Sequence, residues 1–313
     1  MKAIRVNQTG GPEVLTLADI ELPAATSDFL RVKVELAGVN FVDVYHRRGQ
    51  YQMTLPSGIG IEGIGSSPSG ERFFWLSVLG SYAQELNIPK NSLTSLPTSR
   101  LTNEQLLPLL CQGMTAHYLV DSAYRVNSGE TALVTAAAGG VGLLLVQLLT
   151  MRGVRVIACA STEARAQLAK DNGAHFVGTY EKLNHLVSEV TNGVGVNVVY
   201  DSVGKDYFDQ CLDSLTPAGM YVLYGGASGP VPPFDLMRLN GKSLAIRRPT
   251  LATYTATPEE RVRRLSELIV LAEKGALQYP AAKVFPLSKA DAAHQLIESR
   301  TYSGKIGLDP WNL

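Results

Sequence analysis

A cluster of small residues at 136–142, "AAAGGVG", has the residue types and spacing to hold an anionic group. The apolar run "ETALVTAA" leads into it, and "LLLVQLL" continues from it as a buried helix would. Backbone N–H groups at the start of a helix that follows a strand bind phosphates well. The spacing Ala137-x-Gly139-x-x-Gly142 fits the dinucleotide pattern G-x-G-x-x-G, with alanine in place of the first glycine. The alternative is a turn that serves only close packing.

The strand context favours the phosphate-binding interpretation, so we predict that a cofactor's pyrophosphate lies on this segment. The predicted contacts are Ala138, Gly139, Gly140, Val141 and Gly142.

The end of the next strand, "VRVIACAS", indicates which nucleotide would bind. An NAD-binding protein usually places Asp or Glu here to bind the ribose hydroxyls. No carboxylate occurs before Glu163, whereas Ser161 and Arg165 suit a 2′-phosphate, to which Arg forms bidentate bonds. Tyr180, at the end of the third strand, is predicted to flank the same pocket. The sequence therefore favours NADPH over NADH.

The elements that would position these residues show two patterns of predicted secondary structure. From about Leu106 to "SLAIRRPTL" (243–251), strands alternate with helices, which predicts a doubly wound parallel sheet. The first part of the chain is rich in strands: "LRVKVELAGVNF" (30–41) alternates apolar and charged residues. After 254 the chain is helical, with Thr257, Pro258 and Glu260 at a helix start.

Composition narrows the class of protein. The 313 residues carry a formal net charge of zero, which argues against a dedicated nucleic-acid or membrane-surface protein. The N-terminus has no apolar signal core, and no apolar run is long enough to span a bilayer. Three widely spaced cysteines suit buried thiols in a reducing compartment. We therefore expect a soluble cytoplasmic protein with no membrane partner.

Six motifs together resemble one family. They are "GGPEVL" (10–15), "AGVNFVDVYHRRGQY" (37–51), "LPSGIGIEG" (55–63), "AAAGGVG" (136–142), "VVYDSVG" (198–204) and "RRPTL" (247–251). In this order they resemble the zeta-crystallin-type quinone oxidoreductases of the medium-chain dehydrogenase/reductase superfamily. The resemblance implies an α/β protein with a GroES-like β-barrel catalytic domain (about 1–114 and 254–313) around a Rossmann domain (about 115–253). It also implies NADPH and a homodimer.

The resemblance also assigns roles by position. Catalytic side chains beside the nicotinamide and the quinone match Asn40, Tyr45 and Tyr51. The further cofactor-binding positions match Thr115, Ser161, Arg165, Tyr180, Ser202, Gly225, Ser228, Arg248 and Lys305.

No metal site is expected. Zinc-dependent relatives in this superfamily place Cys and His where this chain has Asn40 and Ile61, and neither residue is a zinc ligand. Glu62 is expected to pair with Arg47 or Arg48. Because a quinone is electron-poor, it accepts reducing equivalents without a Lewis acid. Asn40, Tyr45 and Tyr51 then serve as hydrogen-bond donors to the developing oxygen charge.

Other interpretations remain open in the sequence. An NADPH-dependent enone or alkenal reductase shares this fold, and a non-catalytic NADPH- or RNA-binding protein is a further alternative. RNA is disfavoured because the arginines Arg261, Arg263 and Arg264 are interspersed with glutamates, which predicts a solvated helix face. The segment at 63–71 is shorter than in the resembled family. It therefore leaves the barrel open on one side or requires Phe73, Phe74 and Trp75 to repack.

Overall fold

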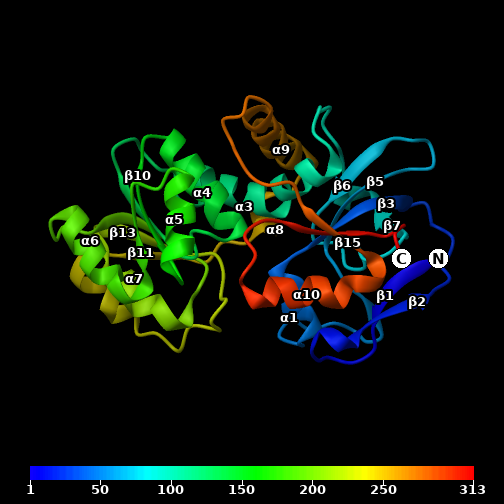
Figure 1. Ribbon diagram of the computed structural model, residues 1–313, viewed down its shortest axis with the longest axis horizontal. Helices are drawn as coiled ribbons and strands as arrows, with labels where there is room; N and C mark the ends of the chain where they lie inside the picture. The colour runs from blue at the N-terminus through cyan, green and yellow to red at the C-terminus, as the bar shows by residue number, and fades with distance from the viewer. The chain divides into compact units, whose positions relative to one another are not determined.

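The computed structural model describes all 313 residues, and the chain divides into two compact units. The first contains Met1–Met114 and Thr255–Leu313, and the second contains Thr115–Tyr254. Figure 1 shows the blue N-terminal strands and the orange to red C-terminal elements together in the first unit. Each unit is described by itself below.

The first unit is built mainly of strands. Its strands are β1 (Lys2–Val6), β2 (Leu15–Asp19), β3 (Phe29–Val39), β4 (Ser57–Gly58), β5 (Glu62–Ser66), β6 (Arg72–Trp75), β7 (Glu85–Pro89), β8 (Leu93–Ser95), β15 (Lys283–Pro286) and β16 (Ile306–Asp309). A small sheet has the order β2-β1-β4, and a larger one runs β15-β16-β3-β5-β6-β8, with β7 also paired to β3. The long strand β3 is therefore the central element, and its alternating Val32 and Val34 are fully buried.

The first unit also contains helices that pack against these sheets. Those of the first unit are α1 (Phe41–Arg47), α2 (Asn103–Leu106), α9 (Pro258–Glu273) and α10 (Ala290–Ser299), and α3 (Cys111–Tyr118) begins there. The predicted helix start at Thr257 is confirmed, because its Oγ1 accepts a 3.3 Å hydrogen bond from the N–H of Glu260. Along α9, Leu265 and Leu268 are fully buried.

The short segment at 63–71 forms a tight hairpin. Strand β5 pairs antiparallel with β6, from Gly63 opposite Trp75 to Ser66 opposite Arg72, and β6 pairs in turn with β8. Phe74 and Trp75 are fully buried, and the indole N–H of Trp75 donates to Ser81 Oγ at 2.8 Å. Of the two outcomes expected from the sequence, the structure shows inward packing of these aromatic side chains.

The predicted solvated arginine face on α9 is wrong for two of its three arginines. Arg261 is buried, and its guanidinium donates to Thr94 Oγ1 at 2.5 Å and to the carbonyls of Asn91 and Thr255 at 3.0 Å. Arg264 is also buried and lies 3.1 Å from the Glu260 carboxylate. Arg263 alone lies on the surface. The acceptors that surround the guanidinium groups of Arg261 and Arg264 indicate that both side chains stabilise the fold.

The second unit is a parallel sheet flanked by helices. Its strands are β9 (Thr131–Val134), β10 (Arg155–Ala160), β11 (Phe176–Thr179), β12 (Val196–Asp201), β13 (Leu215–Leu223) and β14 (Ala245–Arg247), in the order β11-β10-β9-β12-β13-β14. The helices are α4 (Gly140–Met151), α5 (Glu163–Asp171), α6 (Leu183–Thr191), α7 (Phe208–Asp213) and α8 (Leu251–Tyr254). All strand pairs are parallel. The predicted Rossmann topology is confirmed.

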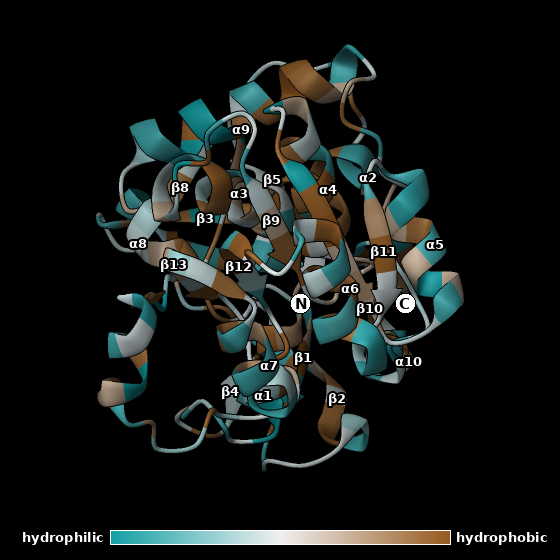
Figure 2. Cartoon of the chain, turned by 90° about the vertical axis from the view of Figure 1, so that its left-hand side faces the viewer, coloured by the Kyte–Doolittle hydropathy of each residue, from teal (hydrophilic) through white to brown (hydrophobic).

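The sheet buries both of its faces. Leu133 and Val199 share a core with Leu183 of α6 and Phe208 of α7, whereas Ala160 packs with Ala166 of α5 in a separate cluster. Figure 2 shows α4 largely in brown, the hydrophobic end of the scale, while α5 mixes teal with brown. Such continuous apolar strands are typical of a parallel sheet covered by helices.

Candidate functional site

The glycine-rich turn links β9 to α4 as the sequence predicts. Gly139 is the N-cap of α4, and its N–H donates to the carbonyl of Ala136 at 2.8 Å. A side chain at Gly142 would place its Cβ 2.4 Å from that same carbonyl, so only glycine fits. The first N–H groups of a helix have no partner within the helix. The N–H groups of Gly140, Val141 and Gly142 are therefore available to an anion such as a phosphate.

Tyr180 supports this turn from the side. Its hydroxyl accepts a 2.7 Å hydrogen bond from the N–H of Ala136, which has a positive φ of 46°. Its ring stacks on that of Tyr207 with centroids 4.1 Å apart. Burial is the main reason that the pKa of the Tyr180 hydroxyl is raised above its usual value. The side chain predicted to flank the 2′-phosphate therefore also holds the glycine-rich turn in place.

The predicted 2′-phosphate residues follow β10. Ser161 is exposed at the end of that strand, and Arg165 lies in the first turn of α5. The Arg165 guanidinium donates to the carbonyl of Ala138 at 3.0 Å, and burial lowers its pKa. The structure thus brings Arg165 to the glycine-rich turn. Glu163 is exposed, and its carboxylate lies 3.5 Å from Lys182 Nζ.

Asp201, at the end of β12, is a residue whose role sequence reasoning missed. Its carboxylate accepts from Thr135 Oγ1 at 2.5 Å and from the Tyr221 hydroxyl at 2.6 Å. It also accepts from the backbone N–H groups of Val203 at 2.8 Å and Gly204 at 3.0 Å. One buried carboxylate therefore ties together the carboxyl ends of β9, β12 and β13. The available signal was an Asp at a strand end with a glycine three residues later.

Three more predicted cofactor residues lie at these strand ends. Ser202 directly follows Asp201, and a Cβ on Gly225 would lie 2.6 Å from the Ser202 carbonyl. Ser228 Oγ donates to the Val203 carbonyl at 2.8 Å. Ligands of open parallel sheets bind at this edge.

Two other predicted cofactor residues of the second unit lie elsewhere in it. Thr115 is mostly buried in α3, and Arg248 is exposed after β14, where it donates to the carbonyl of Pro249 at 3.2 Å. No hydrogen bond joins either side chain to the glycine-rich turn.

The predicted catalytic residues belong to the first unit and lie on or beside α1. Asn40 is the N-cap of this helix, and Tyr45 lies within it. The rings of Tyr45 and Tyr51 meet edge to face with centroids 5.5 Å apart, and Tyr51 is 45% exposed. The structure thus brings the two tyrosines together at the end of α1 and leaves Asn40 at its start.

Asn40 is held by two buried charged side chains. Its Nδ2 donates to Glu62 Oε2 at 2.7 Å, and Lys305 Nζ donates to its Oδ1 at 2.8 Å. Glu62 and Lys305 also form a direct ion pair, and both side chains are fully buried. The expected pairing of Glu62 with Arg47 or Arg48 is wrong. Both arginines pair with Glu298, and Lys305, from the far end of the sequence, takes their place.

Asp43 fixes the backbone at the same helix start. Its Oδ2 accepts from the Asn40 N–H at 2.8 Å and from the Tyr82 hydroxyl at 2.9 Å, while its Oδ1 is buried without a partner. Burial raises the pKa of Asp43 to about 7. Tyr82 lies 3.1 Å from His294 Nε2, and burial, together with Arg47, lowers the pKa of His294 to about 3.

Neither a metal cluster nor a membrane span is evident. No three His, Cys, Asp or Glu side chains lie close enough to hold a metal ion. None of the helices combines the length and the apolar character that crossing a membrane requires.

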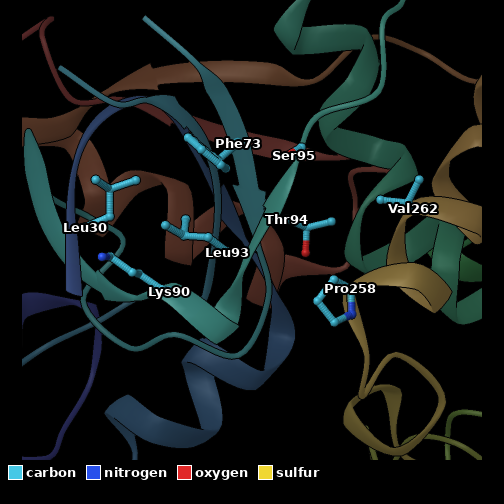
Figure 3. Close-up of a pocket in the computed structure, with 8 residues that line it drawn as sticks. All are labelled: Leu30, Phe73, Lys90, Leu93, Thr94, Ser95, Pro258 and Val262. Carbon is cyan, nitrogen blue, oxygen red and sulfur yellow. The ribbon is translucent and has the colours of Figure 1, made fainter. Parts of the chain in front are cut away.

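A surface pocket of about 380 Å³ lies in the first unit (Figure 3). It is lined by Leu30, Phe73, Lys90, Leu93, Thr94, Ser95, Pro258 and Val262. None of the predicted site residues lines it, so this hollow between barrel strands and α9 is separate from the proposed chemistry.

Comparison with known proteins places the chain in a family. Residues 140–270 match the family model described as zinc-binding dehydrogenase. The chain is 36% identical to the quinone oxidoreductase of Pseudomonas aeruginosa, over 99% of each chain. It is 34% identical to a 2-haloacrylate reductase of a Burkholderia species, over 97% of this chain and 98% of the relative.

A solved structure agrees with this placement. The quinone oxidoreductase of Escherichia coli complexed with NADPH superposes with a TM-score of 0.94 at 34% identity. That alignment covers 99% of this chain and all of the other. The family and fold predicted from the motifs are confirmed, and the chain belongs to the quinone oxidoreductases of the medium-chain dehydrogenase/reductase superfamily.

Proposed function

We propose that this protein is an NADPH-dependent quinone oxidoreductase that works without zinc. The observation that carries the proposal is the anchoring of the Arg165 guanidinium on Ala138, within the turn whose N–H groups start α4. A fixed cation beside an anion-binding helix start suits a cofactor with both a pyrophosphate and a 2′-phosphate. The relatives named quinone oxidoreductase, and the NADPH complex of the Escherichia coli protein, support it.

The residues at the carboxyl edge of the parallel sheet fit NADPH. The N–H groups of Gly140, Val141 and Gly142 would bind the pyrophosphate, and Ser161 and Arg165 would bind the 2′-phosphate. Neither the glycine-rich turn nor the segment after β13 has room for a larger side chain, since a Cβ at Gly142 or at Gly225 would lie within 2.6 Å of a carbonyl oxygen. When bound, NADPH supplies a hydride.

The acceptor chemistry rests on hydrogen-bond donors. Reduction of a quinone by a hydride and a proton gives a hydroquinone, and negative charge develops on the quinone oxygens as the hydride arrives. Amide and phenol donors stabilise such charge. The Asn40 amide and the Tyr45 and Tyr51 hydroxyls would supply them. By the family resemblance, Asn40 and Ile61 stand where zinc-dependent members of the superfamily have Cys and His, and neither side chain is a zinc ligand.

The test is NADPH oxidation with ortho- and para-quinones, with and without EDTA. We expect turnover with quinones that the chelator leaves unchanged. Loss of activity with EDTA, or turnover confined to alcohols and aldehydes, would contradict the proposal.

A double-bond reductase is the second candidate. The 34% identity to a 2-haloacrylate reductase favours it, because that relative is named for an activated alkene substrate. A hydride acceptor of that kind also needs an oxygen-stabilising donor and no metal. A panel of enones and enals, assayed beside the quinones at equal concentration, separates the two candidates by kcat/KM.

A homodimer is part of the proposal. Strand β14 is an edge of the parallel sheet and exposes Ile246, and the neighbouring short helix at 236–242 leaves Leu236 72% and Met237 69% exposed. An open edge beside apolar side chains suits pairing with a second copy across a two-fold axis. Light scattering at micromolar concentration should give twice the chain mass, and Leu236→Asp with Met237→Asp should give the monomer. A wild-type monomer would contradict it.

The cytoplasm is the proposed location. The three cysteines are unpaired, and Cys159 and Cys211 are buried, which suits a reducing compartment.

A further inference from the structure

A buried ion pair lies beside Asn40, the residue that caps the start of α1. Glu62 lies at the start of β5 and Lys305 directly precedes β16, so segments far apart in sequence meet here. Both side chains are completely buried. Removing two charges from water costs about as much as their attraction returns, and apolar residues often stabilise such a place equally well. Their position around Asn40 suggests another role.

The geometry points to Glu62 and Lys305 as positioning residues that fix the amide of Asn40 for the acceptor; this inference rests on the proposed function. An ammonium group can only donate, and a carboxylate can only accept. Asn40 Oδ1 must therefore face Lys305 Nζ, at 2.8 Å, and Nδ2 must face Glu62 Oε2, at 2.7 Å. Because Lys305 can only donate and Glu62 can only accept, the side-chain amide of Asn40 cannot exchange the positions of its oxygen and nitrogen.

This arrangement leaves one amide donor unused. Of the two N–H bonds on Asn40 Nδ2, one is taken by Glu62, and no other protein acceptor contacts the group. The Asn40 backbone is fixed as well, by the hydrogen bond from its N–H to Asp43 Oδ2. The second N–H thus has a direction set before any ligand arrives. A donor held in this way stabilises charge on an acceptor oxygen without reorganisation.

The surrounding backbone makes room for the pair. Gly38 of β3 lies opposite Glu62 of β5 and opposite Gly307 of β16. A Cβ on Gly38 would lie 2.2 Å from Glu62 Oε2 and 3.0 Å from Lys305 Cε. The other carboxylate oxygen, Glu62 Oε1, accepts from the N–H of Cys111 at 2.7 Å. The carboxylate is therefore confined on several sides, which is what a positioning group requires.

Two changes disturb the positioning of the Asn40 amide by Glu62 and Lys305 in different ways. The double variant Glu62→Gln, Lys305→Met removes both charges and leaves neither unpaired. Gly38→Ala keeps every charge and displaces the carboxylate, because the new Cβ would lie 2.2 Å from Glu62 Oε2. The backbone tolerates alanine there, since Gly38 does not have a positive φ. Glu298→Gln is the matched control, since it breaks the ion pairs to Arg47 and Arg48 in the same unit and Glu298 makes no hydrogen bond to Asn40. Unfolding midpoints of all variants show that the folded protein is being compared.

The activity test measures kcat with a quinone at saturating NADPH, together with the Kd of NADPH. We expect kcat to fall about 10- to 100-fold in the double variant and in Gly38→Ala, as for a misplaced group. The Kd of NADPH should stay near the wild-type value, and Glu298→Gln should keep wild-type kcat. In an Asn40→Ala background, the double change should cause no further loss of kcat.

Two results would overturn the inference. They are wild-type kcat in the double variant and an equal loss of kcat in the Asn40→Ala background. A weakened NADPH affinity at wild-type kcat would make Lys305 a cofactor contact instead.

A measurement on the protein alone separates this inference from the proposed function. The side-chain amide of Asn40 gives an NMR signal, identified by its loss in Asn40→Ala. That signal should shift in the double variant and in Gly38→Ala but not in Glu298→Gln. A wild-type protein that reduces no quinone contradicts the proposed function, whereas an unshifted amide signal contradicts the positioning of Asn40 by Glu62 and Lys305.

Discussion

The hydroxyl of Tyr180 accepts a 2.7 Å hydrogen bond from the backbone N–H of Ala136, at the point where β9 enters the glycine-rich turn. Ala136 has a positive φ of 46°, a conformation that costs a non-glycine residue energy. The stacked pair of Tyr180 and Tyr207 braces that hydroxyl. The conformation of the turn therefore depends on a side chain 44 residues away in sequence.

Tyr180→Phe should weaken NADPH and NADH binding to the same extent. Without the hydroxyl, the N–H of Ala136 loses its acceptor, which costs about 1–3 kcal/mol. The effect reaches the pyrophosphate part of the turn, which both cofactors share. Protein fluorescence titrated with each cofactor measures the two Kd values. A selective loss of NADPH affinity would instead mean that the hydroxyl contacts the 2′-phosphate.

Arg165→Ala should remove the preference for NADPH. The guanidinium is fixed on the Ala138 carbonyl and, in our proposal, bonds the 2′-phosphate that NADH lacks. NADPH affinity should fall about 10- to 100-fold, as expected for one charge-assisted bidentate contact, while NADH affinity changes little. Lys182→Ala is the control, because Lys182 is a surface cation that pairs with Glu163. An unchanged ratio of the two Kd values would show that Arg165, which follows β10, does not select NADPH over NADH.

The Rossmann unit could be predicted from sequence because its signals are local. Apolar strands, glycine stops and the turn spacing each lie within a few residues, and the same sequence windows produce β9, α4 and β10 in the structure. The partner of Glu62 could not be predicted in this way. Lys305 is 243 residues away, and its pairing depends on β16 lying beside β3, which no local pattern contains.

The arginines of α9 show the same limit. Glutamates beside Arg261 and Arg264 suggested a solvated face, since charge spacing on a helix says nothing about which side meets another element. The hydroxyl of Thr94 and the carbonyl of Asn91, both about 170 residues earlier, bind Arg261. The burial of an arginine depends on such long-range acceptors, and these cannot be seen in a sequence window.

Arg261→Met should destabilise the protein far more than Arg263→Met on the same helix. Arg261 donates to a hydroxyl and several carbonyls from a buried position, and its loss leaves acceptors unpaired, at a cost of about 2–4 kcal/mol. Arg263 lies nearer the surface and pairs with Glu260 and Glu267, whose side chains are 42% and 48% exposed. Surface pairs of this kind are worth about 0–1 kcal/mol. Denaturant unfolding of the two variants measures the difference. Equal midpoints would contradict the structural role of Arg261.

The pH dependence of stability should contain two opposing contributions from one hydrogen-bonded cluster. The pKa of Asp43 is raised from 3.8 to about 7, so between about pH 4 and 7 the folded protein binds more protons at this group than the unfolded chain. The free energy of unfolding therefore falls as pH rises through this range. The pKa of His294 is lowered from 6.5 to about 3, which makes the unfolded chain the stronger proton binder and gives the opposite slope.

Single substitutions should reveal each contribution. Asp43→Asn keeps an acceptor for the Asn40 N–H and the Tyr82 hydroxyl but cannot ionise, so its stability relative to wild type should increase from pH 5 to pH 8. Lys305, Glu62, Tyr82 and Arg47 also face this cluster and remain in both proteins. His294→Gln should lose stability relative to wild type as pH rises from 4 to 6.5, because the wild-type protein gains there and the variant does not.

Urea unfolding at half-unit pH intervals measures both differences. Tyr82 joins the two groups, with its hydroxyl 2.9 Å from Asp43 and 3.1 Å from His294, so the double variant should depart from the sum of the single effects. A difference between Asp43→Asn and wild type that stays constant from pH 5 to pH 8 would show that Asp43 is ionised throughout. In that case the buried carboxylate at the start of α1 would be stabilised as an anion by Lys305 and Arg47, and the opposing slopes would not exist.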